Sequence, residues 1–116
     1  MTLLSQKDQL PAGFIYNNIL ALRDGTVIGI LLGHCVFDRD GQVAAKYFRH
    51  TLFNLQGEIL AKNLDSNTSL SFDKEKLLKE AWQIIELIKD HICPMIDPTE
   101  NWSMISLASY FSNEGK

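Results

Sequence analysis

Two histidines and one cysteine have side-chain types and a spacing that could serve metal binding or nucleophilic catalysis. His34 and His50 lie sixteen positions apart, and Cys35 directly follows His34. Imidazole and thiolate groups are good zinc ligands, and a cysteine arranged with a histidine and Asp38 could act as a nucleophile. These spacings match no known zinc pattern, however, and two ordinary histidines in exposed turns would look the same.

A second candidate is the stretch VFDRDG, residues 36–41, whose aspartates precede a glycine as in a calcium-binding loop. An EF-hand loop needs its glycine at position six and a bidentate glutamate at position twelve. Counting from Gly41 places Val36 at position one and Tyr47 at position twelve, and neither side chain carries a carboxylate. We therefore interpret the stretch as a β-turn in which Asp38 bonds to the backbone and Gly41 adopts a left-handed conformation.

The two cysteines, Cys35 and Cys93, are far apart and form no CxxC motif. A disulfide framework normally uses more cysteines in a shorter chain, so both are predicted to be free, buried thiols. The tripeptide HIC adds His91 beside Cys93 as a further conceivable metal ligand. No nucleophile-elbow, phosphate-loop or zinc-protease motif is present.

The candidate residues belong to a pattern that recurs every sixteen residues. Stretches that begin at residues 19, 35 and 51 share a glycine at the same place, namely Gly25, Gly41 and Gly57, with apolar residues in matching columns. Each unit predicts a β-hairpin, and Asp38 or Asn54 would open the turn that the glycine closes. The shorter connections between units are Asn17–Asn18 (NN), Gly33–His34 (GH) and Arg49–His50 (RH). NN and GH suit two-residue turns, and RH suits them less well.

The unit FDxxGxVxA, residues 37–45, resembles the Tyr/Phe-Asp turn repeats of many bacterial β-repeat proteins, and the start of the chain is similar to a PRC-barrel. This resemblance covers residues 19–64. It implies hairpin structure and carries no function or site residue.

Beyond residue 64 the apolar periodicity changes to that of a helix. The spacing predicts one helix from Asp73 to Ile92, capped by Ser71 or Asp73 and ended by Pro94, with Leu78 and Trp82 widening its apolar stripe. A second helix is predicted from the N-cap Asp97 to about Ser112. Strands followed by helices predict a single α+β domain, residues 1–116. It would contain an antiparallel β-meander over residues 14–64, open or curled into a barrel, and a two-helix segment over residues 71–112 packed on one face.

The stretch VIGILLG, residues 27–33, is apolar on both faces, so both faces should be covered. Two helices cover one face of a meander, and Ile28, Ile30 and Leu32 are therefore predicted to form an interface with a second copy or a protein partner, unless the sheet closes. The last strand carries Glu58 and Lys62, which suits the edge of a sheet.

Length and charge exclude some classes of function. The 116 residues carry a formal charge of −3 without a basic stripe, which argues against nucleic-acid binding. No apolar run reaches the roughly 20 residues of a membrane span, and the N-terminus lacks a secretory signal, so a cytoplasmic location is expected. The sequence favours a non-enzymatic binding or interaction module without a cofactor that self-associates. The alternative is a small metal-binding protein or hydrolase-type enzyme that uses His34, Cys35 and His50.

Overall fold

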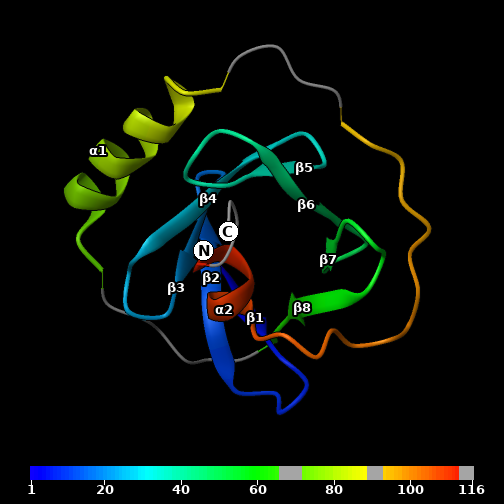
Figure 1. Ribbon diagram of the computed structural model, residues 1–116. Helices are drawn as coiled ribbons and strands as arrows, with labels where there is room; N and C mark the ends of the chain where they lie inside the picture. Colours follow the sequence, from blue (N-terminus) through cyan, green and yellow to red (C-terminus); the bar gives the residue numbers. More distant parts are fainter. Residues whose placement is uncertain (66–71, 89–92, 113–116) are drawn as a thin grey trace.

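Eight antiparallel strands close into a barrel in the computed structural model, which describes residues 1–65, 72–88 and 93–112 (Figure 1). The strands follow one another in chain order, and β1 pairs with both β2 and β8. They are β1 (Thr2–Ser5), β2 (Pro11–Tyr16), β3 (Ile19–Leu22), β4 (Val27–Leu32), β5 (Cys35–Phe37), β6 (Val43–Phe48), β7 (Thr51–Asn54) and β8 (Ile59–Asn63). The predicted antiparallel sheet is confirmed in its curled form.

The sheet begins at Thr2, whereas the sequence pattern placed its start near Phe14. The first hairpin escaped the pattern because Gln9, with φ of 63°, stands where the other hairpins have glycine. The prediction of an edge at the last strand is wrong. In β8, Lys62 pairs with Ser5 and the next residue pairs with Leu4, so the backbone groups of both strands are used and no edge remains there.

The connections at the two ends of the barrel differ in kind. At one end, Gly25, Gly41 and Gly57 have φ of 93°, 80° and 86°, and each donates its N–H to the carbonyl three residues earlier. At the other end, Arg49 and His50 both have positive φ, at 54° and 60°. This connection forms a two-residue turn although Arg and His suit one less well, because pairing of the strands on either side fixes the turn.

Two of the glycines allow a matched test of these turns. Gly57 (φ +86°) sits so close to the Asp97 carbonyl that a Cβ would collide with it, whereas a Cβ on Gly33 (φ +62°) would meet open space. We expect Gly33→Ala to lower the free energy of unfolding by about 1 kcal/mol, the cost of the left-handed conformation alone. Gly57→Ala should cost about 3 kcal/mol, because backbone must also move. Urea denaturation measures both, and equal losses would contradict the close approach of residue 97 to this turn.

One buried cluster fills the barrel and draws fully buried residues from every strand except β2, whose partly buried Ala12 and Ile15 pack against it. Its fully buried members include Leu4, Leu20, Val36, Leu52 and Leu60. The short helix α2 (Leu107–Ser112) lies over one end of the barrel (Figure 1) and adds Leu107 and Phe111, which are 0% and 3% exposed, to the same cluster. The Tyr110 hydroxyl donates to the Ala44 carbonyl. Helix α2 therefore closes the barrel at the end that has the glycine turns.

The long helix α1 (Lys74–Ile85) packs instead on the outside of the barrel (Figure 1). Its residues Leu77, Ala81 and Ile84 share a second buried cluster with side chains of β1 to β4, among them Phe14 and Ile30. The two helices thus cover an outer wall and an open end, and the prediction that both lie on one face is wrong. Strand β4 is buried on both faces, as its apolar sequence predicted, by the barrel interior and by α1.

Both predicted helices are longer than the helices in the structure. Asp73 caps α1 as predicted, and its carboxylate accepts from the N–H groups of Glu75 and Lys76. The helix ends at Ile85 rather than Ile92. Just after this end, the Leu87 backbone packs against Gly41. Residues 89–92 of the predicted range lie outside the described residues.

The second predicted helix is wrong over residues 97–106, which contain no helix. The Thr99 N–H donates to the Gly57 carbonyl, and the Ile59 N–H donates to the Asn101 carbonyl. Trp102 forms a parallel bridge with Ile59. These hydrogen bonds to β8 replace the helical ones, so tertiary pairing overrides a good capping sequence.

Candidate functional site

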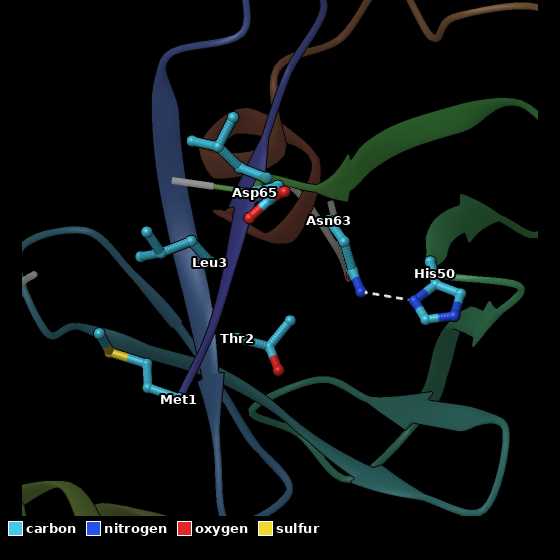
Figure 2. A pocket seen from close by; sticks show the side chains of 7 residues that line it. Met1, Thr2, Leu3, His50, Asn63 and Asp65 are labelled. Atoms are coloured by element: carbon cyan, nitrogen blue, oxygen red, sulfur yellow. Dashed lines mark hydrogen bonds between the residues drawn. The ribbon is translucent and has the colours of Figure 1, made fainter. Parts of the chain in front are cut away.

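The two predicted site histidines lie in the tight turns at the end of the barrel opposite α2, and they are joined through Tyr47 and Asn63. The Tyr47 hydroxyl donates to Asn63 Oδ1 at 2.6 Å, and Asn63 Nδ2 donates to His50 Nδ1 at 2.9 Å (Figure 2). His34 Nδ1 donates to the Tyr47 carbonyl at 3.3 Å. The histidine rim, as we name these four residues, is thus one hydrogen-bonded network.

The network fixes which ring nitrogens carry a lone pair. An amide N–H₂ group can only donate, so neutral His50 must accept at Nδ1 and carry its proton at Nε2. A carbonyl can only accept, so His34 carries its proton at Nδ1. The lone pair of His50 is therefore already engaged by Asn63, and a metal ion could bind it only after breaking that hydrogen bond. This arrangement suits a structural closure of the rim better than a metal centre.

A cavity of about 450 Å³ lies beside the rim, at the seam between β1 and β8 (Figure 2). Its lining combines apolar and polar side chains: Met1, Thr2, Leu3, His50, Asn63, Leu64 and Asp65. Asp65 and His50 are its titratable side chains, and His50 is already held by Asn63. The cavity has room for a small polar molecule.

Cys35 and Cys93 form a disulfide, with their Cα atoms 6.0 Å apart. The prediction of free thiols is therefore wrong. It failed because 58 residues separate the two cysteines in sequence, and the closeness of β5 to the segment after α1 is a tertiary feature. A disulfide sulfur offers no thiolate, so Cys35 supplies neither a nucleophile nor a metal ligand while the bond is intact.

The fold brings no further metal ligand next to His34, Cys35 and His50 within the described residues. Within residues 1–65, 72–88 and 93–112, no group of three or more His, Cys, Asp or Glu side chains could hold a metal ion. His91 lies outside the described residues. The alternative hypothesis of a metal-binding protein or hydrolase stays a prediction, and it would require reduced Cys35.

In the stretch that first resembled a calcium loop, the Asp38 side chain bonds to its own turn. Asp38 is 4% exposed, and its Oδ1 accepts from the N–H groups of Asp40 and Gln42. Asn54 does the same for the N–H groups of Gln56 and Glu58 in the equivalent turn. Each side chain thus satisfies backbone donors that strand pairing leaves open.

In the turn before β4, Leu22 stands at the position of Asp38 and Asn54, and Asp24 accepts the backbone hydrogen bond instead. Its Oδ1 accepts from the Thr26 N–H at 2.9 Å. That hydrogen bond holds the pKa of the Asp24 carboxyl below its usual range, because it favours the charged form.

Comparison with models of known protein families, with curated proteins and with solved structures finds no match to this chain. Neither helix in the described part of the chain has the length and apolar character that a membrane span requires.

Of the three residues predicted to form an interface, two are covered within the chain. Ile28 belongs to the barrel interior and is 6% exposed, and Ile30 lies under α1 and is 2% exposed. Leu32 is 43% exposed at the end of β4. The predicted interface stays a prediction, and of these residues Leu32 could reach a partner without unfolding.

A more extensive apolar surface lies on α1 and was missed. Leu78, Trp82 and Ile85 are 39%, 64% and 37% exposed, and we call them the α1 stripe. The apolar periodicity placed Leu78 and Trp82 on the buried face of the helix, but both are exposed. The signal was present, since each stripe residue directly follows a buried one, and neighbours in a helix point about 100° apart.

Proposed function

We propose that this protein is a non-enzymatic interaction module that self-associates through the α1 stripe. The observation that carries the proposal is the 64% exposure of Trp82 between two further exposed apolar residues on a helix that is already anchored by its other face. Exposed apolar patches of this kind mark association sites, because water contact with them is unfavourable. The predicted self-association therefore moves from the sheet to the helix.

The charges beside the stripe favour a second copy as its occupant. Lys79 and Glu86 are exposed and lie along the same edge of the stripe. Lys79 precedes Trp82 by three residues and Glu86 follows it by four, so an antiparallel pairing centred on Trp82 brings each lysine next to the partner's glutamate. A surface that complements itself in this way is what a two-fold dimer requires.

The test is the molar mass of the protein in solution. We expect light scattering at rising protein concentration to approach twice the chain mass of 13.1 kDa. Trp82→Glu should remain a monomer over the same range, because it places a charge in the centre of the paired stripes. Gln83→Glu is the matched control, since it adds the same charge to an exposed position of α1 beside the stripe and should still dimerise.

Two results would refute this assignment. One is a wild-type protein that keeps the monomer mass at every concentration, and the other is a Trp82→Glu variant that associates as strongly as wild type. Circular dichroism of both variants establishes that the barrel and α1 are still folded, because the side chains of Trp82 and Gln83 are exposed.

The same proposal includes the interpretation of three hairpins as copies of a sixteen-residue repeat. It is supported by equivalent N–H donations from Gly25, Gly41 and Gly57, which recur at that spacing. The cytoplasmic location and the exclusion of nucleic acids and membranes as partners stay predictions. The disulfide points away from the cytoplasm, because such bonds persist in oxidising compartments. The number of free thiols in protein isolated under conditions that prevent thiol exchange tests whether Cys35 and Cys93 are bonded in the cell.

A further inference from the structure

The outer wall of β6 to β8, away from α1 in Figure 1, carries cations that lie over aromatic rings. Lys46 Nζ and Arg49 Cζ lie 6.0 and 5.6 Å from the ring centre of Phe48. Lys62 Nζ lies 5.8 Å from the ring centre of Trp102, which the extended segment before α2 contributes. We call these five residues the basic wall.

Strand register places these side chains on one continuous surface. Thr51 pairs with Phe48 on one side and with Lys62 on the other, so the three form a row across β6, β7 and β8. Neighbouring strands are about 4.8 Å apart, which puts Phe48 and Lys62 about 10 Å apart. That separation matches the reach of a short stretch of extended peptide.

The cations of the basic wall lack acidic partners in the described part of the chain. Among the described residues, the ion pair joins Arg39 to Glu80 on another part of the molecule, and Lys46, Arg49 and Lys62 form none there. Residues 42–64 contain three cations and one acid, Glu58, in a protein whose net charge is −3. The Glu58 carboxylate accepts from Asn54 Nδ2 in the turn. The wall is thus a local excess of positive charge on an acidic protein.

We propose that the basic wall binds a short acidic segment of a partner protein. Carboxylates of the segment would pair with Arg49 and Lys62, and an apolar side chain between them would lie on the Phe48 ring. The Lys46 ammonium is fixed by its donation to the Pro94 carbonyl at 3.0 Å, so it adds charge without having to be ordered on binding. The net negative charge and the small number of cations favour a short peptide over a long polyanion such as nucleic acid, which the rest of the surface would repel.

Fluorescence anisotropy of a labelled deca-glutamate peptide tests the proposal with the full chain. We expect saturable binding that weakens as salt is raised from about 50 to about 500 mM, because exposed charges are then screened. The Arg49→Glu/Lys62→Glu variant should bind at least about tenfold more weakly, since two attractive pairs become repulsive. The Lys74→Glu/Lys76→Glu variant changes the formal charge equally at two exposed positions of α1, away from the wall, and should bind within about twofold of wild type.

The outcomes are distinct. Equal weakening of peptide binding in both variants would show a general charge effect and overturn the assignment to the basic wall. Wild-type peptide affinity in the Arg49→Glu/Lys62→Glu variant would overturn it as well. Tighter binding of single-stranded RNA or of anionic lipid vesicles than of the peptide, lost in the same variant, would overturn the class of partner. Trp82→Glu should keep the peptide affinity of wild type, because the α1 stripe lies on another wall, so failure of the dimer proposal does not affect this test.

Discussion

The Cys35→Ser/Cys93→Ser variant is expected to lose about 4 kcal/mol of the free energy of unfolding. The disulfide closes a loop of 58 residues, which removes much of the freedom of the unfolded chain, and longer loops give larger effects. The bond also ties the segment that leads to α2 onto β5, whose Cys35 is 2% exposed. Urea denaturation of the oxidised wild type and of the variant measures the difference.

Reducing agent provides the control for this prediction. Wild-type protein in excess reductant should lose most of the same stability, whereas the serine variant should not respond to reductant. A wild type that is equally stable with and without reductant, with its thiols shown to be free, would contradict a stabilising role of the bond. A larger loss in the variant than in reduced wild type would measure the cost of placing the Cys35→Ser hydroxyl at a buried position.

Phe111→Ala is expected to cost about 3 to 5 kcal/mol, because it removes a large side chain from the end of the barrel core. Phe111 is 3% exposed and shares the barrel cluster with buried residues of seven of the eight strands. Helix α2 has six residues and is too short to be stable by itself, so its place depends on Phe111 and Leu107. Thermal unfolding or urea denaturation measures the loss.

Ile105→Ala is the matched control, because Ile105 precedes α2 and is 49% exposed. Its effect should stay within about 0.5 kcal/mol, as for most exposed substitutions. Similar losses in the two variants would mean that α2 does not close the barrel. A loss confined to Phe111→Ala, with intact strand signals in circular dichroism, would show that the barrel walls persist while their closure weakens.

The local turn chemistry could be predicted from the sequence because it depends on neighbouring residues. An Asx side chain three positions before a glycine predicts a turn, and Asp38 and Gly41 lie in one. The cap at Asp73 was predicted for the same reason. The first hairpin was missed where Gln9 takes a conformation that usually belongs to glycine.

The candidate site was less accessible to sequence reasoning. The pattern singled out His34 and His50, but the residues that fix their chemistry, Tyr47 and Asn63, come from β6 and β8 and show no motif. The exposure of Trp82 depends on how α1 rotates against the barrel, and periodicity alone cannot divide a wide apolar arc into buried and exposed halves.

By itself, the sequence determined the hairpins, the order of strands before helices and the apolar face of α1, because periodicity and turn residues act over a few positions. The tertiary structure decided the closure of β1 on β8, the bond between Cys35 and Cys93 and the non-helical course of residues 97–106. Each of these depends on which distant segments come to lie side by side. Hydrogen bonds to β8 outweighed a capping sequence there, since a few helix-favouring residues are worth less than several paired backbone groups and a buried anchor such as Phe111.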